Sequence, residues 1–140
     1  MNAVHITAAT ILCWIGMQPA HMTFTTLDRS HQSQIEEPRQ AVARTPAEWA
    51  ALWEAHGGEG KPPAVDLSRS IVIGVFLGTR PTAAHTVEIV RIEQRDTDLV
   101  VTYREQRPAP GDMVAQMLTA PFHIVRTGAH PGPVRFQPTR

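Results

Sequence analysis

The chain of 140 residues is long enough for one domain with a well-buried core and too short for two ordinary domains. Thirteen basic and thirteen acidic residues give a net charge of zero, and like charges cluster no further than Glu36-Glu37, so neither nucleic acid nor an anionic membrane surface is expected as a partner. The single cysteine, Cys13, excludes a disulfide within the chain.

The first part of the chain contains an apolar run at residues 8–17. Its length suits the hydrophobic segment of a secretion signal and is too short to span a bilayer, so no membrane insertion is expected. No lysine or arginine precedes the run, and a cut after Ala20 would leave Gln18 where a small residue is needed. Two interpretations of residues 1–23 therefore stay open, a weak signal peptide or an apolar extension, with the domain itself expected at 24–140.

Short apolar or alternating runs, separated by glycine, proline and aspartate, predict strands at residues 40–44, 71–77, 86–93, 99–105, 116–127 and 134–136. The unbroken run at 71–77 is expected to be a central strand covered on both faces. Asp96-Thr97-Asp98 should form the turn of a hairpin, with alternating buried and exposed positions on its second arm. Pro121 indicates an edge strand or a bend.

The clearest element is a helix that begins after Thr45. Thr45-Pro46-Ala47-Glu48 is a capping box with proline at the first helical position, and Gly57-Gly58 supplies a left-handed stop. The apolar positions at helical spacing are Trp49, Leu52, Trp53 and His56. We expect this stripe to pack on a core. The predicted fold class is α+β, an antiparallel β-sheet or partly closed sandwich of six to seven strands with one packed α-helix.

No catalytic or metal-binding pattern is apparent. The seven histidines lack the pairwise spacing of a zinc site, and Asp66 with Ser68 or Ser70 lacks the motif that surrounds a nucleophilic serine. The glycines at 57–60 follow a helix, whereas a phosphate-binding loop precedes one. The histidines that folding could still bring together are His56, His85 and His123. We expect no catalytic residues, no metal, no cofactor and no enzymatic activity.

The loop at residues 78–85 is the candidate binding site. It leaves the predicted central strand and combines the polar or stiff residues Arg80, Pro81, Thr82 and His85. Loops held between rigid strands commonly carry binding residues. The alternative is a plain connection between two strands.

Several motifs between Leu27 and Phe136 follow one another in the order and spacing of a known family. They are Ser33-Gln34-Ile35, Trp49, Trp53-Glu54-Ala55-His56, Pro63-Ala64-Val65-Asp66-Leu67, Val75-Phe76-Leu77-Gly78-Thr79-Arg80-Pro81-Thr82, Tyr103-Arg104-Glu105, Pro108 and Thr119-Ala120-Pro121-Phe122-His123-Ile124-Val125. The chain thus resembles the C-terminal domain of the PrcB protease-complex subunit. Ala83-Ala84-His85 departs from the family, which has glycine and tyrosine there, and implies a reshaped loop. Leu67, where the family usually has phenylalanine, is a change that a core tolerates.

The resemblance implies a non-catalytic protein-binding domain that associates with a protease or other exported protein and stabilises it. It also implies a location outside the cytoplasm, periplasmic or extracellular. An alternative of a different class is a protease-inhibitor module that inserts Pro81-Thr82 of the 78–85 loop into an active-site cleft, by analogy with inhibitors of the chagasin type.

Overall fold

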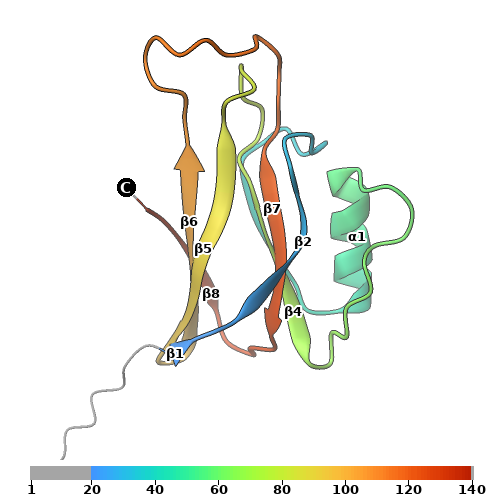
Figure 1. Ribbon diagram of the computed structural model, residues 1–140. Coiled ribbons are helices and arrows are strands. Elements are labelled where there is room, and N and C mark those ends of the chain that lie inside the picture. Colours follow the sequence, from blue (N-terminus) through green and yellow to red (C-terminus); the bar gives the residue numbers. More distant parts are fainter. Residues whose placement is uncertain (1–19, 140) are drawn as a thin grey trace, which may run out of the picture.

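The computed structural model describes residues 20–139, which form two four-stranded sheets packed face to face with one helix on the outside (Figure 1). The strands are β1 (Ala20–His21), β2 (Phe24–Ser30), β3 (Arg39–Ala43), β4 (Ser70–Phe76), β5 (Thr86–Arg95), β6 (Asp98–Gln106), β7 (Phe122–Gly128) and β8 (Val134–Pro138). One sheet has the order β1-β5-β6-β8 and the other β2-β7-β4-β3. Every paired neighbour is antiparallel except β6 and β8.

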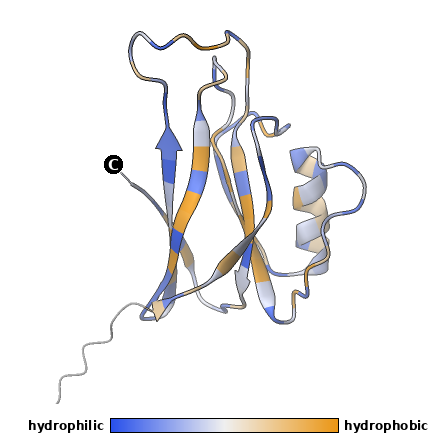
Figure 2. Cartoon of the chain, in the orientation of Figure 1, coloured by the Kyte–Doolittle hydropathy of each residue, from blue (hydrophilic) through white to orange (hydrophobic). Residues whose placement is uncertain are grey.

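Strand β4 is covered on both faces, as its unbroken apolar sequence predicted. Ile71, Ile73 and Val75 point between the two sheets, whereas Val72 and Phe76 point toward the helix. All five are almost completely buried. Burial of each such side chain stabilises the fold by about 1.5–3 kcal/mol. Figure 2 shows the corresponding hydrophobic bands along the central strands of both sheets.

The helix α1 (Pro46–His56) begins and ends where the sequence predicted. The Thr45 hydroxyl accepts a hydrogen bond from the Glu48 amide at 3.2 Å, and Gly57 closes the helix in the left-handed conformation with φ of 83°. Its buried side chains are Trp49, Leu52, Trp53 and His56. The predicted stripe is therefore confirmed as core, packed on the β2-β7-β4-β3 sheet. No helix among residues 20–139 is long and apolar enough to cross a membrane.

The β5–β6 hairpin is confirmed, but its second arm is buried more completely than the predicted alternation. Val100 and Thr102, on the outer face, are as inaccessible as the core. Val100 lies between Glu93 and Arg135 on the neighbouring strands. Long charged side chains can cover an apolar neighbour with their aliphatic parts, which explains the burial.

The α+β fold is confirmed, although the described residues hold eight strands rather than six or seven. The additional strands are β1 and β2, whose polar sequences gave no signal. The strand predicted at 116–127 begins only at Phe122 and lies centrally between β2 and β4, so Pro121 precedes a strand and marks no edge. β1 lies within the segment 1–23 treated above as a leader or extension, whereas the apolar run and Cys13 lie outside the described residues.

Candidate functional site

Two loops meet at one end of the sandwich, at the top of Figure 1. The 78–85 loop joins β4 to β5, and the 107–121 loop joins β6 to β7. Main-chain hydrogen bonds connect the two loops. The Arg80 amide donates to the Thr119 carbonyl at 2.7 Å, and the Thr119 amide donates to the Arg80 carbonyl at 2.9 Å. The Ala83 amide donates to the Ala115 carbonyl. We call these two loops the loop end.

Gly78 allows the first of these loops to turn closely against the segment 36–38. Its φ is 77°, a conformation that favours glycine. A Cβ atom there would lie 2.7 Å from the Glu36 carbonyl oxygen and 2.8 Å from the Pro38 nitrogen. The Thr79 amide then donates to the Glu36 carbonyl, which fixes the start of the loop.

The four predicted binding residues have different environments. Arg80 and His85 both turn inward to Glu105, with Arg80 Nε at 3.0 Å and His85 Nδ1 at 3.8 Å from its Oε1 atom. Thr82 is half-buried, its hydroxyl has no hydrogen-bond partner among the described residues, and its carbonyl accepts a bond from Thr119. Pro81 is the exposed member. The structure therefore brings Arg80 and His85 together and leaves Pro81 and Thr82 apart from them.

Glu105 is the electrostatic centre of this cluster. Its side chain is 18% exposed and lies between the guanidinium groups of Arg80 and Arg107, the latter at 3.4 Å. Burial alone would raise the pKa of Glu105, but hydrogen bonds from Arg80 and Arg107 outweigh it and lower the pKa below its ordinary value. Glu105 is therefore a carboxylate that holds both arginines in place.

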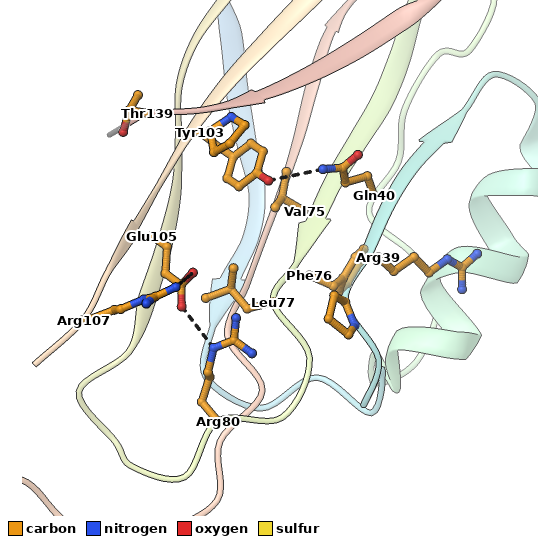
Figure 3. A pocket seen from close by; sticks show the side chains of 12 residues that line it. Arg39, Gln40, Val75, Phe76, Leu77, Arg80, Tyr103, Glu105, Arg107 and Thr139 are labelled. Carbon is orange, nitrogen blue, oxygen red and sulfur yellow. Dashed lines mark hydrogen bonds and ion pairs between the residues drawn. The ribbon is translucent and has the colours of Figure 1, made fainter.

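A groove of about 490 Å³ opens beside this cluster, between the edges of the two sheets (Figure 3). Gln40 on β3 and Tyr103 on β6 bridge it through a hydrogen bond of 3.3 Å. Its other polar walls are Arg39, Arg80, Glu105 and Arg107. Sequence reasoning did not assign Tyr103, Glu105, Arg39 or Arg107 to a site, although the alternation on β6 could have placed Tyr103 and Glu105 on one inward face.

The 107–121 loop carries the exposed apolar surface of the described residues. Met113, Met117 and Leu118 are the large hydrophobic side chains that remain exposed among residues 20–139. Such side chains gathered in one loop are typical of a contact surface for another protein. Methionine is common in such surfaces because its flexible side chain adapts to the partner.

Ser33, His56 and Asp28 form a chain of hydrogen bonds. Ser33 Oγ lies 2.9 Å from His56 Nδ1, and His56 Nε2 lies 3.3 Å from Asp28 Oδ2. The order resembles a catalytic triad, but the Ser33 hydroxyl also accepts the Ile35 amide. The Ser33 and Gln34 amides donate to carbonyl groups, so they are not oriented to stabilise an oxyanion. The network joins the segment 31–35 to the end of α1.

The other catalytic and metal hypotheses find no support in the geometry. Asp66 accepts hydrogen bonds from the side chain and amide of Ser68, which lower its pKa and hold it in its own turn. His56 packs on Phe122 on the helix side of the β2-β7-β4-β3 sheet, whereas His123 points between the sheets and His85 lies at the loop end. Residues 20–139 contain no group of three potential ligands close enough to hold a metal ion.

In a comparison with protein families, residues 71–128 match the family model described as PrcB C-terminal. Over these residues the chain is similar to the PrcB C-terminal family. The PrcB segment comprises β4 to β7 and both loops of the loop end. The resemblance inferred from the sequence is thus confirmed there, and its motifs at Ser33, Trp53 and Asp66 lie outside the match. This similarity points to a domain associated with protease complexes. No curated protein and no solved structure matches the chain.

Proposed function

We propose that the chain is a non-catalytic protein-binding domain that associates with a protease or another exported protein and stabilises it. A protein that binds only the folded state of its partner shifts the partner's unfolding equilibrium toward that state. The observation that carries the proposal is the gathering of Met113, Met117 and Leu118 on a loop that lies inside the family segment.

The loop end is suited to binding because it is held in one conformation before a partner arrives. The ladder between Arg80 and Thr119 fixes the two loops to each other, and Glu105 fixes Arg80 to β6. A preformed surface loses little conformational freedom on association, so more of the contact free energy contributes to affinity. The Arg80–Glu105 pair therefore acts as an internal support, and Pro81 and the exposed apolar side chains make the contacts.

The inhibitor alternative places Pro81-Thr82 in a protease cleft. The exposure of Pro81 favours it, but the Thr82 carbonyl is occupied by Thr119, and an inserted loop would have to give up that bond. Addition of the purified chain to its partner protease separates the two roles. A stabiliser prolongs the activity of the protease, whereas an inhibitor abolishes it.

Co-purification of the tagged full chain from its native source, with identification of the partner by mass spectrometry, tests the proposal. The variant Met117→Ser/Leu118→Ser should weaken the partner's binding about tenfold or more, because these side chains are exposed in the free domain and would be buried by a partner. The control is Arg104→Gln, on the outer face of β6 and paired with Glu88. Equal recovery of the partner with both variants would refute the role of the loop.

A further inference from the structure

Strand β3 lies at the edge of its sheet and is hydrogen-bonded only to β4. In an antiparallel pair, the amide and carbonyl groups of every second residue point away from the neighbouring strand. Within the described part of the chain, residues 39–43 make no main-chain hydrogen bonds outside this pairing. The outer groups of β3 are therefore available to a further strand.

This edge is less protected than the other edges of the two sheets. β8 ends in Pro138, β1 is only two residues long, and β2 carries Asp28 and Arg29 beside an irregularity in its pairing. These are devices by which proteins prevent strands from adding to an edge. β3 has Arg39 at its start, but its last three residues, Ala41-Val42-Ala43, are small and uncharged.

A groove flanks β3 on each face. Gln40 faces the 490 Å³ groove described above and Val42 packs on the core between the sheets, whereas Ala41 and Ala43 face α1. A second groove of about 390 Å³ lies between β3 and α1. Successive side chains of a strand added to β3 would point to opposite faces, so they would enter the two grooves alternately.

The chemistry of the two grooves differs. The helix-side groove is formed mainly by apolar side chains, with the charged residues Arg39 and Glu48 also lining it; the apolar residues are Ala41, Val42, Ala43, Ala51, Leu52 and Ala55. It suits small apolar side chains. The sandwich-side groove holds the guanidinium groups of Arg80 and Arg107 and the carboxylate of Glu105. Arg39 also borders this groove, but its side chain points toward α1 (Figure 3). The excess positive charge of the sandwich-side groove suits an acidic side chain.

We propose that the free edge of β3 binds an extended segment of the partner protein as an additional strand, in which acidic side chains alternate with small apolar ones. The proposal rests on the protein-binding function above and adds a second contact beside the loop end. Main-chain hydrogen bonds would supply affinity and the two grooves selectivity. A second copy of β3 fits poorly, since it would place the positively charged sandwich-side grooves of the two copies, with Arg80 and Arg107, side by side.

The probe for this edge is the peptide Asp-Ala-Glu-Val-Asp-Ala-Glu amide with fluorescein on its N-terminal amine, titrated into the full chain. We expect saturable binding and slowed hydrogen exchange of the amides at 39–43. A lysine-for-acid peptide should bind at least about tenfold more weakly, and so should a peptide with alternate amides methylated on the edge-facing side. No binding of the acidic peptide, or equal binding of the lysine peptide, overturns the proposal.

Two pairs of matched variants locate the binding. Ala51→Tyr fills the helix-side groove, whereas Ala50→Tyr places the same side chain on an exposed helix position that does not line it. Arg107→Gln removes a positive charge from the sandwich-side groove, whereas Arg104→Gln removes one from the outer face of β6. The first member of each pair should weaken the peptide about fivefold or more at an unchanged melting temperature, and the second should not. Equal effects within a pair contradict the site.

These experiments distinguish a failure of the β3-edge proposal from a failure of the proposed stabilising function. If Met117→Ser/Leu118→Ser abolishes partner capture while Ala51→Tyr and Arg107→Gln leave partner and peptide binding unchanged, the strand-adding edge is wrong and the protein-binding role stands. If the peptide binds at β3 and no partner is stabilised, the edge stands and the stabilising role is wrong. Concentration-dependent dimerisation that Ala51→Tyr abolishes would assign the edge to a second copy and contradict the proposal.

Discussion

His123 on β7 joins the two sheets by accepting a hydrogen bond of 2.9 Å from the Ile89 amide of β5 at its Nδ1 atom. The pairing of β5 with β6 shifts between Ile89 and Arg91, beside this bond. His123 Nε2 lies 2.8 Å from the Thr26 hydroxyl, so the proton of the neutral ring is on Nε2. A protonated ring would turn the acceptor of the Ile89 amide into a donor and break the connection between the sheets.

This geometry predicts a loss of stability in mild acid. Burial and the charge of Arg29 lower the pKa of His123 from 6.5 to about 4, although Glu88 acts in the opposite direction. The unfolded chain takes up the proton near pH 6.5 and the folded chain only near pH 4. The free energy of unfolding therefore falls as the pH drops below about 6.5, with about 2 kcal/mol lost by pH 5.

Urea unfolding at pH 7 and pH 5 tests this prediction, with His123→Gln as the comparison. Glutamine can accept from Ile89 and donate to Thr26, but it does not titrate. The wild type should lose about 2 kcal/mol more than the variant between the two pH values. An identical pH dependence of the two proteins would show that His123 is not the titrating group.

Trp53→Ala should cost about 3–5 kcal/mol, a large share of the stability of a domain this size. Trp53 is buried in the core between α1 and the β2-β7-β4-β3 sheet. Its ring packs edge-on to that of Trp49, with the ring centres 5.6 Å apart, and Gly58 lies directly against the ring. Thermal and urea unfolding measure the loss, with the exposed Glu54→Ala on the same helix as the control. A melting temperature within a degree or two of the wild type would place Trp53 outside the core.

Glu105→Gln should destabilise the loop end, because it removes the carboxylate that holds Arg80 and Arg107. We expect a cost of about 1–3 kcal/mol, the range for removing one partner of a partly buried charged hydrogen bond. Glu88→Gln, on the exposed outer face, should cost less than about 1 kcal/mol. Urea unfolding compares the two variants, and equal small losses would mean that the cluster does not support the fold. Arg80→Ala should also destabilise the domain, because it removes the Nε group that lies 3.0 Å from the Glu105 carboxylate.

The start of the mature chain is a separate prediction. If residues 1–23 contain a cleaved signal, the protein from its native host should lack roughly its first 20 residues. Met22 should remain, because its amide donates to the Ile92 carbonyl and ties the chain to β5. Intact-mass measurement of the exported and cytoplasmic fractions decides the question. A chain that begins at Met1 in the cytoplasm would contradict export.

The elements that sequence reasoning located correctly carry their signal within a few adjacent residues. Thr45, Glu48 and Gly57 define the two ends of α1 by short-range hydrogen bonds. The apolar run of β4 indicates burial on both faces without reference to its neighbours. Asp96, with φ of 54°, occupies the turn of the hairpin, a conformation that aspartate tolerates better than most residues.

The features that sequence reasoning missed depend on contacts between distant parts of the chain. β1 and β2 are strands only because they pair with β5 and β7 at the sheet edges. Glu105 collects Arg80 and His85 from a loop twenty or more positions away in sequence, so its role was invisible locally. The Met117 and Leu118 side chains gave no sign of exposure, because apolar residues near Pro121 are equally typical of a strand.

The lifetime of the partner protein in the presence of the full chain tests the central claim most directly. The partner recovered by co-purification is incubated alone, with the wild type, and with Met117→Ser/Leu118→Ser, and its folded fraction is followed by limited proteolysis. We predict that the wild type prolongs the folded state, by a factor that grows with its concentration above the dissociation constant, and that the loop variant does not. A partner that decays at the same rate with and without the wild type would contradict the stabilising function.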